Sequence, residues 1–428
     1  MKTRFVPLGE SYKALFAACS AGTQPDWLAV RRKGAIDRLR RDGLPTRQVE
    51  VWKYTDISPL AERALVLPAR INSRSALPPN LPFWHEDDLN IVFVDGQFSP
   101  EQSSAVQSDE IQVVRLNDLA TNPETAPSDM LASALMNAAF RRDGVLVRIP
   151  AHCQLERRIH FVLLHASKTP DAILAPWLAV VAEESAEARI AITALSISES
   201  PCLHVPRVFV SAAAGAQLAV SQSQLMNDQS WQLGTTRIEQ HRDSRVTHLE
   251  AAVGAALARH DLAAVLLESG AEVELNGLYV QRNHRHVDFH TWIEHRQPNC
   301  RSRQVYKGIV DDHAAAVFNG AVRVHPGASG TDGYQLNRTL LMSRDAQVFS
   351  KPELLIDNDD VKCSHGATIG QISAQELFYL QSRGIPEAQA RHMLSRAFVE
   401  DVLFRQKDAR QRADLDILLD HYFPTGHD

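Results

Sequence analysis

The chain has 428 residues, of which 44% are hydrophobic and 22% are charged, and its formal net charge is −6. This composition is typical of a folded protein and excludes wholesale disorder, and the lack of a basic excess argues against a nucleic-acid binder. The five cysteines are an odd number without a CxxC pair, which argues against a disulfide framework and against a self-contained zinc finger.

No uninterrupted apolar stretch of about 18 residues occurs in the chain, so we expect no transmembrane helix and no membrane partner. The N-terminal segment "MKTRFVPLGESYKALFAACS" contains basic side chains, but Glu10 and Lys13 interrupt any apolar core of signal-peptide length. We therefore predict a cytoplasmic protein.

Residues 1–130 are predicted to form a mostly helical domain. The segment "DWLAVRRKGAIDRLRRDGLP" places its apolar side chains at helical spacing, and Gly43 is expected to end this helix. Further on, "LNIVFVDGQFSP" predicts a strand followed by a turn at Asp95 and Gly96.

Residues 131–372 are predicted to form a β core. Short strand-like runs follow one another, among them "RIHFVLLHA", "AEVELNGLYV" and "RQVYKGIV", and their turns hold Gly, Asn and Asp. So many strands with hardly a helix between them exclude an α/β fold and leave a β-sandwich, a barrel or a β-solenoid. The unbroken run of strands favours the solenoid, although no strict repeat period can be read.

Residues 373–428 are predicted to form a C-terminal helical domain. Ser373 followed by Glu376 is a capping-box pattern, and Gly384 is expected to end the helix that they begin. The next helix carries an apolar stripe made of Met393, Leu394, Phe398, Val402 and Leu403. This stripe is a candidate docking surface for a partner protein, and the alternative is that it packs on the chain's own body.

Several common enzyme signatures are absent from the sequence. There is no GxxxxGK[ST] phosphate-binding loop, no GxGxxG after a strand, no HExxH and no GxSxG. We therefore expect no nucleotide hydrolysis by the chain itself, and no hydrolase or dehydrogenase activity of a common type.

Histidines crowd into "NHRHVDFHTWIEH", residues 283–295. If this segment is a strand, alternation directs Val287, Phe289 and Ile293 into the core. The opposite face then holds His284, His286, Asp288, His290 and Glu294. Two histidines on one strand face can bind a metal ion. A solvated or partner-facing surface is the favoured interpretation, because polar faces are the default for half-buried strands.

A second candidate site lies in "DDVKCSHGATIG", residues 359–370. Read as a strand, it directs Val361, Cys363 and His365 to one side, with Cys363 and His365 about 7 Å apart along the backbone. A tetrahedral metal site needs about four ligands, so these two would form half of a site that a partner chain completes. A nucleophile–base pair lacks an apparent third group. Spacing alone favours a buried thiol and a satisfied histidine.

Residues 314–403, which include "YQLNRTLLMSRDAQVFSKPELLIDNDDVKCSHGATIG", strongly resemble the C-terminal core of the SufB/SufD family. The earlier "VDFHTWIEHRQPNCRSRQVYKGIV" looks like the preceding coils of that family. Residues 49–59, "EVWKYTDISPL", resemble the Trp-Lys-Tyr-Thr segment typical of its SufD branch. The match runs in order along the chain.

The resemblance implies a right-handed parallel β-helix, or β-solenoid, flanked by N- and C-terminal helical domains. It also implies a component of the Suf machine for iron–sulfur cluster assembly, which pairs with SufB and binds the ATPase SufC through its C-terminal helices. The nascent cluster is expected at the SufB–SufD interface, where the motif match places His365 with Cys363 beside it. The family complex is also linked to a reduced flavin, for which the sequence shows no signature.

Two function classes follow. The preferred one is a non-enzymatic scaffold that acts with a separate ATPase, holds no tightly bound cofactor by itself and can form a homodimer when isolated. The alternative is a carbohydrate-active enzyme on a β-helix, such as a polysaccharide lyase or esterase, with His284, Asp288 and His290 as its candidate residues.

Overall fold

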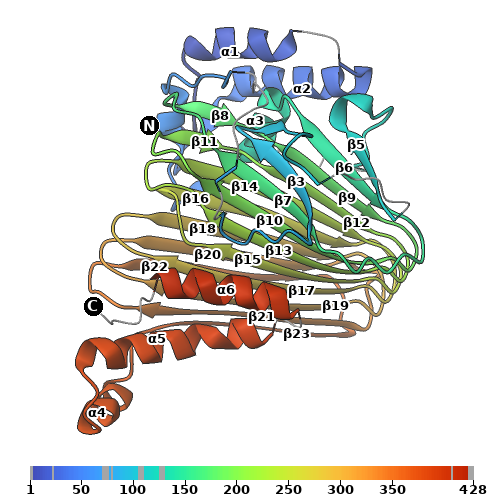
Figure 1. The fold of residues 1–428 in the computed structure, drawn as a ribbon. Coiled ribbons are helices and arrows are strands. Elements are labelled where there is room, and N and C mark those ends of the chain that lie inside the picture. Colours follow the sequence, from blue (N-terminus) through green and yellow to red (C-terminus); the bar gives the residue numbers. More distant parts are fainter. Residues whose placement is uncertain are drawn as a thin grey trace.

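The structure, a computed structural model, describes residues 3–21, 24–69, 77–78, 81–104, 110–124, 131–405 and 408–422. Within them, a long body of strands lies between N-terminal and C-terminal helices (Figure 1). The chain is mainly β, a β-solenoid of about 8 turns with flanking helices, as the sequence predicted. Its expected right-handed winding stays a prediction.

Two sheets form the solenoid, and from β12 onward successive strands alternate between them. The ten-stranded sheet runs in the order β4 (Gln97–Phe98), β3 (Leu89–Val94), β7 (Ile159–His165), β10 (Glu187–Ser196), β13 (Gln217–Leu225), β15 (Arg245–Ala252), β17 (Glu272–Gln281), β19 (Arg301–Val310), β21 (Thr331–Leu341), β23 (Val361–Gly370). The eleven-stranded sheet runs β5 (Gln112–Arg115), β6 (Gly144–Ile149), β9 (Trp177–Ala182), β12 (Arg207–Ala212), β14 (Trp231–Gln240), β16 (Leu257–Leu266), β18 (His286–His295), β20 (Ala315–Val324), β22 (Gln347–Ile356). In the same sheet, β11 (Cys202–His204) pairs with β14, and β8 (Ala172–Leu174) pairs with β11.

Within the two large sheets as described, neighbouring strands pair in parallel except the short β4 and β5, which pair antiparallel with β3 and β6. The separate β1 and β2 also pair antiparallel. Each coil therefore stacks on the coil before it, and each buries its apolar face only with the help of its neighbours.

The main core lies between the two sheets. In β18, Val287, Phe289 and Ile293 are at most 1% exposed and belong to this core. His286, Asp288 and the other even-numbered residues of the strand therefore face outward, because successive side chains alternate. The predicted division of this strand into a core face and a polar face is confirmed.

The N-terminal elements confirm two local predictions. The predicted helix is α2, and at its end Gly43 has a φ of +74° while its N–H bonds the carbonyl of Leu39 at 2.9 Å. Asp95 and Gly96 form the predicted turn between β3 and β4, with φ of +49° and +76°. The elements here are β1 (Phe5–Val6), α1 (Ser11–Ser20), α2 (Asp26–Asp42), β2 (Leu44–Pro45), the 3-10 helices η1 (Glu50–Trp52), η2 (Ser58–Ala61) and η3 (Leu116–Asp118), and α3 (Ala132–Phe140).

One helix lies inside the stretch that is expected to hold strands. The sequence of α3, "ASALMNAAF", is rich in alanine, the strongest helix former, and almost all of its residues are buried. Conversely, β3 and β5 come from the stretch expected to be mostly helical, and they join the two sheets. The division of the chain at residues 130 and 372 stays a prediction.

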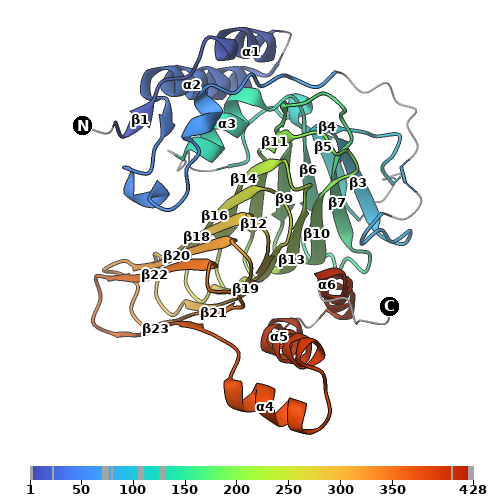
Figure 2. The same ribbon diagram turned by 90° about the vertical axis from the view of Figure 1, so that its left-hand side faces the viewer.

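Three helices follow the last strand: α4 (Ala374–Ser382), α5 (Glu387–Phe404) and α6 (Ala409–Tyr422). The capping prediction is confirmed, because the hydroxyl of Ser373 accepts a hydrogen bond from the N–H of Glu376 at 3.3 Å. Helices α5 and α6 lie against the outer face of the ten-stranded sheet, whereas α4 projects from the body (Figure 2).

Candidate functional site

In the part of the chain that the structure describes, the last coil of the solenoid leaves two strand edges free. Strands β22 and β23 pair with β20 and β21, and each is the terminal strand of its sheet. Each is 10 residues long and carries a row of backbone N–H and C=O groups along the outer edge. Such an edge is a template for pairing with a strand of another chain.

The apolar core is also uncapped at this coil. In β20, Val322 and Val324 are 1% and 0% exposed. Their register partners in β22 are Leu354, which is only partly buried, and Ile356, which is 37% exposed. Ile369 of β23 is 44% exposed. Solenoids normally close their ends with polar caps, so this surface has the character of an interface.

Cys363 lies on the inner face of β23 and packs against the main core. Its register partner in β21 is Gly333, and a Cβ atom on that glycine would lie 3.1 Å from the Cys363 sulfur. The glycine therefore makes room for the thiol. Burial raises the pKa of the Cys363 thiol, outweighing the lowering effect of a backbone hydrogen bond from Gly333, so the group is protonated at neutral pH.

His365 follows on the same face of β23, as strand alternation predicted, but its side chain is exposed. Its register partner Gln335 is buried and donates to the carbonyl oxygen of the Gln304 side chain at 2.8 Å. His365 thus stands at the open end of an inner polar row, beside the half-buried thiol. Among the described residues, no cluster of three or more His, Cys, Asp and Glu side chains is arranged to hold a metal ion.

The polar face of β18 serves a structural role. Asp288 is 1% exposed and accepts a hydrogen bond from Arg259 at 2.9 Å and another from Thr55 at 2.5 Å, while His290 lies 3.0 Å from its other oxygen. Burial alone would raise the pKa of Asp288, but the charge of Arg259 and these hydrogen bonds hold it below its usual value. The carboxylate is therefore ionised and committed to its partners.

His284 does not share that face. β18 begins at His286, so His284 lies in the preceding turn, where it is exposed and stacks on His313 with ring centroids 5.1 Å apart. Asp288 is buried and committed to its partners, and His284 lies in the turn before β18, so the three candidate residues of the carbohydrate-active alternative do not share one site.

The Trp-Lys-Tyr-Thr segment docks on the outer face of the solenoid. The guanidinium of Arg259 lies 3.7 Å from the ring centroid of Trp52. The ring of Tyr54 stacks on Phe349 of β22, with centroids 4.2 Å apart and planes at 12°. In the sequence, this segment stood out only through its resemblance to the family. In the structure it connects the N-terminal region to β16, to β18 and to β22, the last of which belongs to the open coil.

The apolar stripe of α5 is divided between two environments. Val402 is fully buried in a cluster shared with the ten-stranded sheet, and Phe398 is half-buried against that cluster. Leu394 is intermediate, and Met393 is 42% exposed. Leu403 lies outside the residues whose side chains the structure describes.

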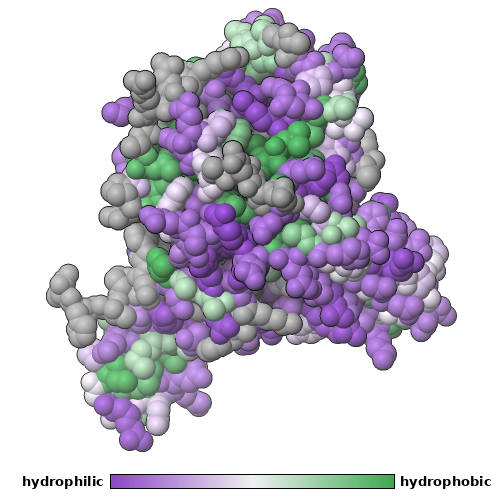
Figure 3. Space-filling view, turned by 45° about the vertical axis from the view of Figure 1, so that its right-hand side comes forward, coloured by the Kyte–Doolittle hydropathy of each residue, from purple (hydrophilic) through white to green (hydrophobic). Residues whose placement is uncertain are grey.

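Helix α4 carries an apolar surface that the sequence pattern did not single out. None of its residues is buried, and Phe378 and Tyr379 are 71% and 57% exposed. In the space-filling view of Figure 3, hydrophobic side chains gather on this projecting end of the molecule. The signal available in the sequence was a pair of adjacent aromatic residues, which cannot both join one narrow helical stripe.

Comparison with known proteins identifies the family. Residues 164–398 match the family described as "SUF system FeS cluster assembly, SufBD core domain", and residues 8–161 match "SufBD protein N-terminal region". The chain belongs to the SufBD family. It is therefore an iron–sulfur cluster assembly protein, and the resemblance seen in its motifs is confirmed.

Relatives of this SufBD protein match it along most of its length. An iron–sulfur cluster assembly SufBD family protein of Synechocystis sp. is 33% identical over 410 residues, 90% of this chain and 89% of the relative. The iron–sulfur cluster assembly protein SufD of Escherichia coli is 31% identical over 383 residues, 87% of this chain and 88% of the relative. The protein ABCI7, chloroplastic, of Arabidopsis thaliana is 31% identical over 425 residues, 95% of this chain and 88% of the relative.

None of the helices described in this SufBD protein combines the length and the apolar character that a membrane span requires.

Proposed function

We propose that the chain is a SufD-type scaffold subunit that pairs with SufB through its last coil and contributes His365 and Cys363 to a cluster assembled at that interface. The observation that carries the proposal is the open end of the solenoid, where two free strand edges and an uncapped core surround these two side chains.

A second solenoid fits this end physically. Strand edges of β22 and β23 can extend into a partner's sheets by backbone hydrogen bonding, while Ile356 and Ile369 become buried. The same edges can pair with a second copy, which accounts for the homodimer expected of the isolated chain. Cys363 and His365 supply two ligands, and a cluster typically needs more, so the partner supplies the others.

The two candidate ligands differ in what must change before they can bind iron. His365 is exposed and offers an imidazole nitrogen without any rearrangement of the coil. Cys363 is half-buried, and its thiol must lose a proton before it binds iron. We therefore expect His365 to contribute more than Cys363 to the first binding of the cluster.

The ATPase SufC is expected to dock on the projecting C-terminal end. Phe378 and Tyr379 of α4, with Met393 of α5, give it exposed apolar side chains. Leu394 lies beside them on α5, whereas Phe398 and Val402 hold α5 on the solenoid. In this proposal the chain performs no catalysis itself, and the energy of assembly comes from the separate ATPase. The reduced flavin and the cytoplasmic location stay predictions.

Co-purification with SufB and SufC tests the proposal. The wild-type chain should elute with both proteins in size-exclusion chromatography. The Ile369→Glu variant should no longer co-elute with SufB but should still co-elute with SufC, because the substitution places a charge on the open coil. The double variant Phe378→Ala, Tyr379→Ala should co-elute with SufB but not with SufC. Val30→Glu is the matched control, since Val30 is 73% exposed on α2. Failure of the wild-type chain to bind either protein contradicts the proposal.

A further inference from the structure

Helix α6 crosses the outer face of the ten-stranded sheet and reaches back to the first strands of the solenoid (Figure 1). Its apolar side chains pack with residues of β15, β17 and β19 and of the helix before it. The cluster contains Leu415, Leu418 and Leu419 of α6, Val399 and Val402 of α5, and Leu249, Ala251, Leu278 and Ile309 of the sheet.

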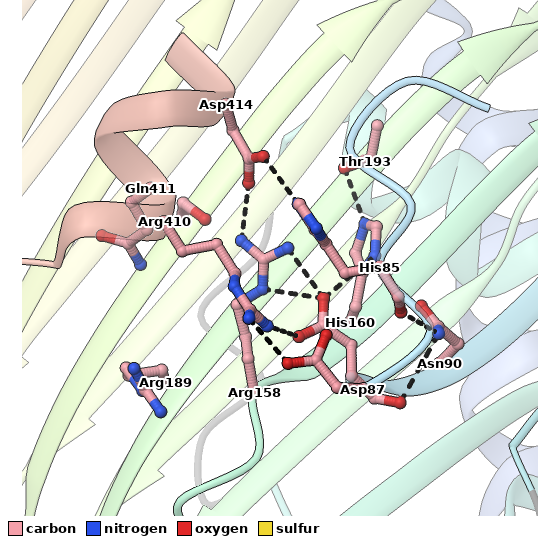
Figure 4. A network of polar contacts seen from close by, with 12 residues as sticks. His85, Asp87, Asn90, Arg158, His160, Arg189, Thr193, Arg410, Gln411 and Asp414 are labelled. Carbon is pink, nitrogen blue, oxygen red and sulfur yellow. Dashed lines mark hydrogen bonds and ion pairs between the residues drawn. The ribbon is translucent and has the colours of Figure 1, made fainter. Parts of the chain in front are cut away.

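A buried ion pair holds the N-terminal half of α6 to the first strands (Figure 4). Arg158, which is 1% exposed and directly precedes β7, donates to Asp414 of α6 at 2.6 Å. The same guanidinium donates to Asp88, which directly precedes β3, at 2.7 Å and 3.0 Å. The Arg158–Asp414 contact joins residues 256 positions apart.

Four further contacts surround this pair. Arg410 of α6 donates to Asp87 at 2.7 Å and to Asp88 at 2.8 Å. His85 lies 3.2 Å from the carboxylate of Asp414. Just before α6, Asp408 accepts a hydrogen bond from Arg189 of β10 at 3.1 Å. We call the contacts of Asp408, Arg410 and Asp414 with the first strands the α6 lock.

The solenoid half of the lock does not need α6. Arg158 and Asp88 remain paired with each other, and the backbone carbonyl of Asp88 also accepts from Arg157 at 3.0 Å. Asn90 ties the same segment by donating to the carbonyl of His85 at 2.9 Å. Breaking a buried ion pair is usually costly because it leaves a buried charge without a partner. If α6 leaves, Arg158 and Asp88 still neutralise each other, so this cost does not arise on the solenoid side.

The solvent-facing part of the lock is formed by Arg410 of α6 and Arg189 of β10, whose side chains are 34% and 43% exposed, whereas those of Asp408 and Asp414 are 8% and 11% exposed. A groove of about 780 Å³ runs along the lock and is lined by His85, Asp87, Arg189, Asp408 and Arg410. Water can therefore replace the contacts of Arg410 with Asp87 and of Arg189 with Asp408. A helix of 14 residues held by three leucines and such a lock is a unit of low local stability, whereas the strands beneath it are paired on both sides.

We propose that α6 is a releasable strap, which fastens the C-terminal helices to the first strands of the solenoid and can leave without unfolding any strand. When fastened, α5 and α6 move with the body. When released, α5 keeps only its own contacts with the sheet, and the apolar outer face around Leu249 and Leu278 is bared. The inference concerns the chain alone and does not depend on which partners bind it.

Amide hydrogen exchange on the full chain, followed by mass spectrometry, tests the strap. Asp414→Asn should speed exchange in residues 409–419 at least tenfold, because it removes the contacts with Arg158 and His85 but leaves Arg158 paired with Asp88. Arg410→Gln, at a partly exposed position that cannot unfold the chain, should speed it several-fold. Exchange in β10, β13 and β15 should stay within twofold of the wild type in both variants.

The matched control is Asp416→Asn, two residues along the same helix, whose carboxylate meets Arg396 of α5 instead of the first strands. It should change exchange in α6 less than twofold. Unchanged exchange in Asp414→Asn and Arg410→Gln overturns the strap, and so does an equal effect of Asp416→Asn. Faster exchange in the strands together with α6 also overturns it, because α6 would then belong to the cooperative unit of the solenoid.

Discussion

Gly270 lies against the side chain of Asp243 at a corner of the solenoid, one coil further along the stack. Both residues have left-handed backbone conformations, with φ of +76° and +55°. A Cβ atom on Gly270 would lie 2.1 Å from the carboxylate oxygen Oδ1 of Asp243. The relation repeats two coils further, where a Cβ on Gly330 would lie 2.5 Å from Oδ1 of Asn299. The corner thus alternates a polar residue with a glycine.

Gly270→Ala should therefore destabilise the chain. A left-handed alanine costs about 1–2 kcal/mol, and the Asp243 side chain must also move, so we expect the free energy of unfolding to fall by about 1–3 kcal/mol. Urea unfolding monitored by circular dichroism measures the change.

Gly327→Ala is the control for that measurement, because no heavy atom of the described residues lies within 4 Å of its added Cβ. We expect a change below about 0.5 kcal/mol. An equal loss in the two variants would mean that the corner geometry is not the cause.

The stacking of Tyr54 on Phe349 should couple the N-terminal segment to the open coil. In a double-mutant cycle with Tyr54→Leu and Phe349→Leu, we expect a coupling free energy of about 0.5–1.5 kcal/mol, the range for aromatic pairs beyond their burial. Urea unfolding of the four chains gives this value. A cycle of Val30→Ala with Phe349→Leu is the control, and strictly additive effects of Tyr54 and Phe349 would refute the coupling.

Strand alternation made much of the solenoid predictable. It assigned Val287, Phe289 and Ile293 to the core and placed Cys363 and His365 on one face, as the structure confirms. It could not show that Cys363 is half-buried while His365 is exposed. That difference arises because β23 belongs to the last coil, where the core has no cap, and a two-residue period carries no information on the number of coils that follow.

Helical periodicity predicted the apolar stripe of α5, but it did not predict which residues of the stripe are buried. It identified a stripe that includes Met393 and Val402, but burial depends on which strands pack against each turn of the helix. Val402 meets the ten-stranded sheet, whereas Met393, nine residues earlier on the helix, is 42% exposed. Contacts between segments this far apart in the sequence depend on register, and without a strict repeat period the sequence does not give that register.

Buried histidines should make the protein sensitive to acid. Burial lowers the pKa of His248 and His160 to about 3, and that of His204 and His295 to about 4. In the unfolded chain each pKa is about 6.5, so the unfolded state binds more protons below that pH. Stability is therefore complete above pH ~6.5 and falls as the pH drops toward the folded values, by up to about 1.4 kcal/mol per pH unit for each histidine.

His248→Phe tests one of these contributions. Both ring nitrogens of His248 lack a hydrogen-bond partner among the described residues, so the substitution removes a titrating group without breaking a hydrogen bond seen there. Between pH 6 and pH 5 the free energy of unfolding should fall less steeply than in the wild type. The difference in slope should be about 1.4 kcal/mol per pH unit, the value for one proton. Val30→Phe, at an exposed position that carries no titrating group, is the control and should leave the slope unchanged. Identical slopes for the wild type and His248→Phe would show that His248 does not take part.

His365→Ala should lower the yield of clusters on the complex with SufB and SufC several-fold, while the melting temperature of the chain stays within about 2 °C, because the side chain is exposed. Cys363→Ala should lower the yield less, since its thiol is half-buried and protonated before metal binding. Ser364→Ala, on the opposite face of the same strand, is the control and should assemble clusters at the wild-type rate. Absorbance of the reconstituted cluster gives the yield. Wild-type yields from both His365→Ala and Cys363→Ala would exclude this face of β23 from cluster assembly, even if the open coil still binds a partner.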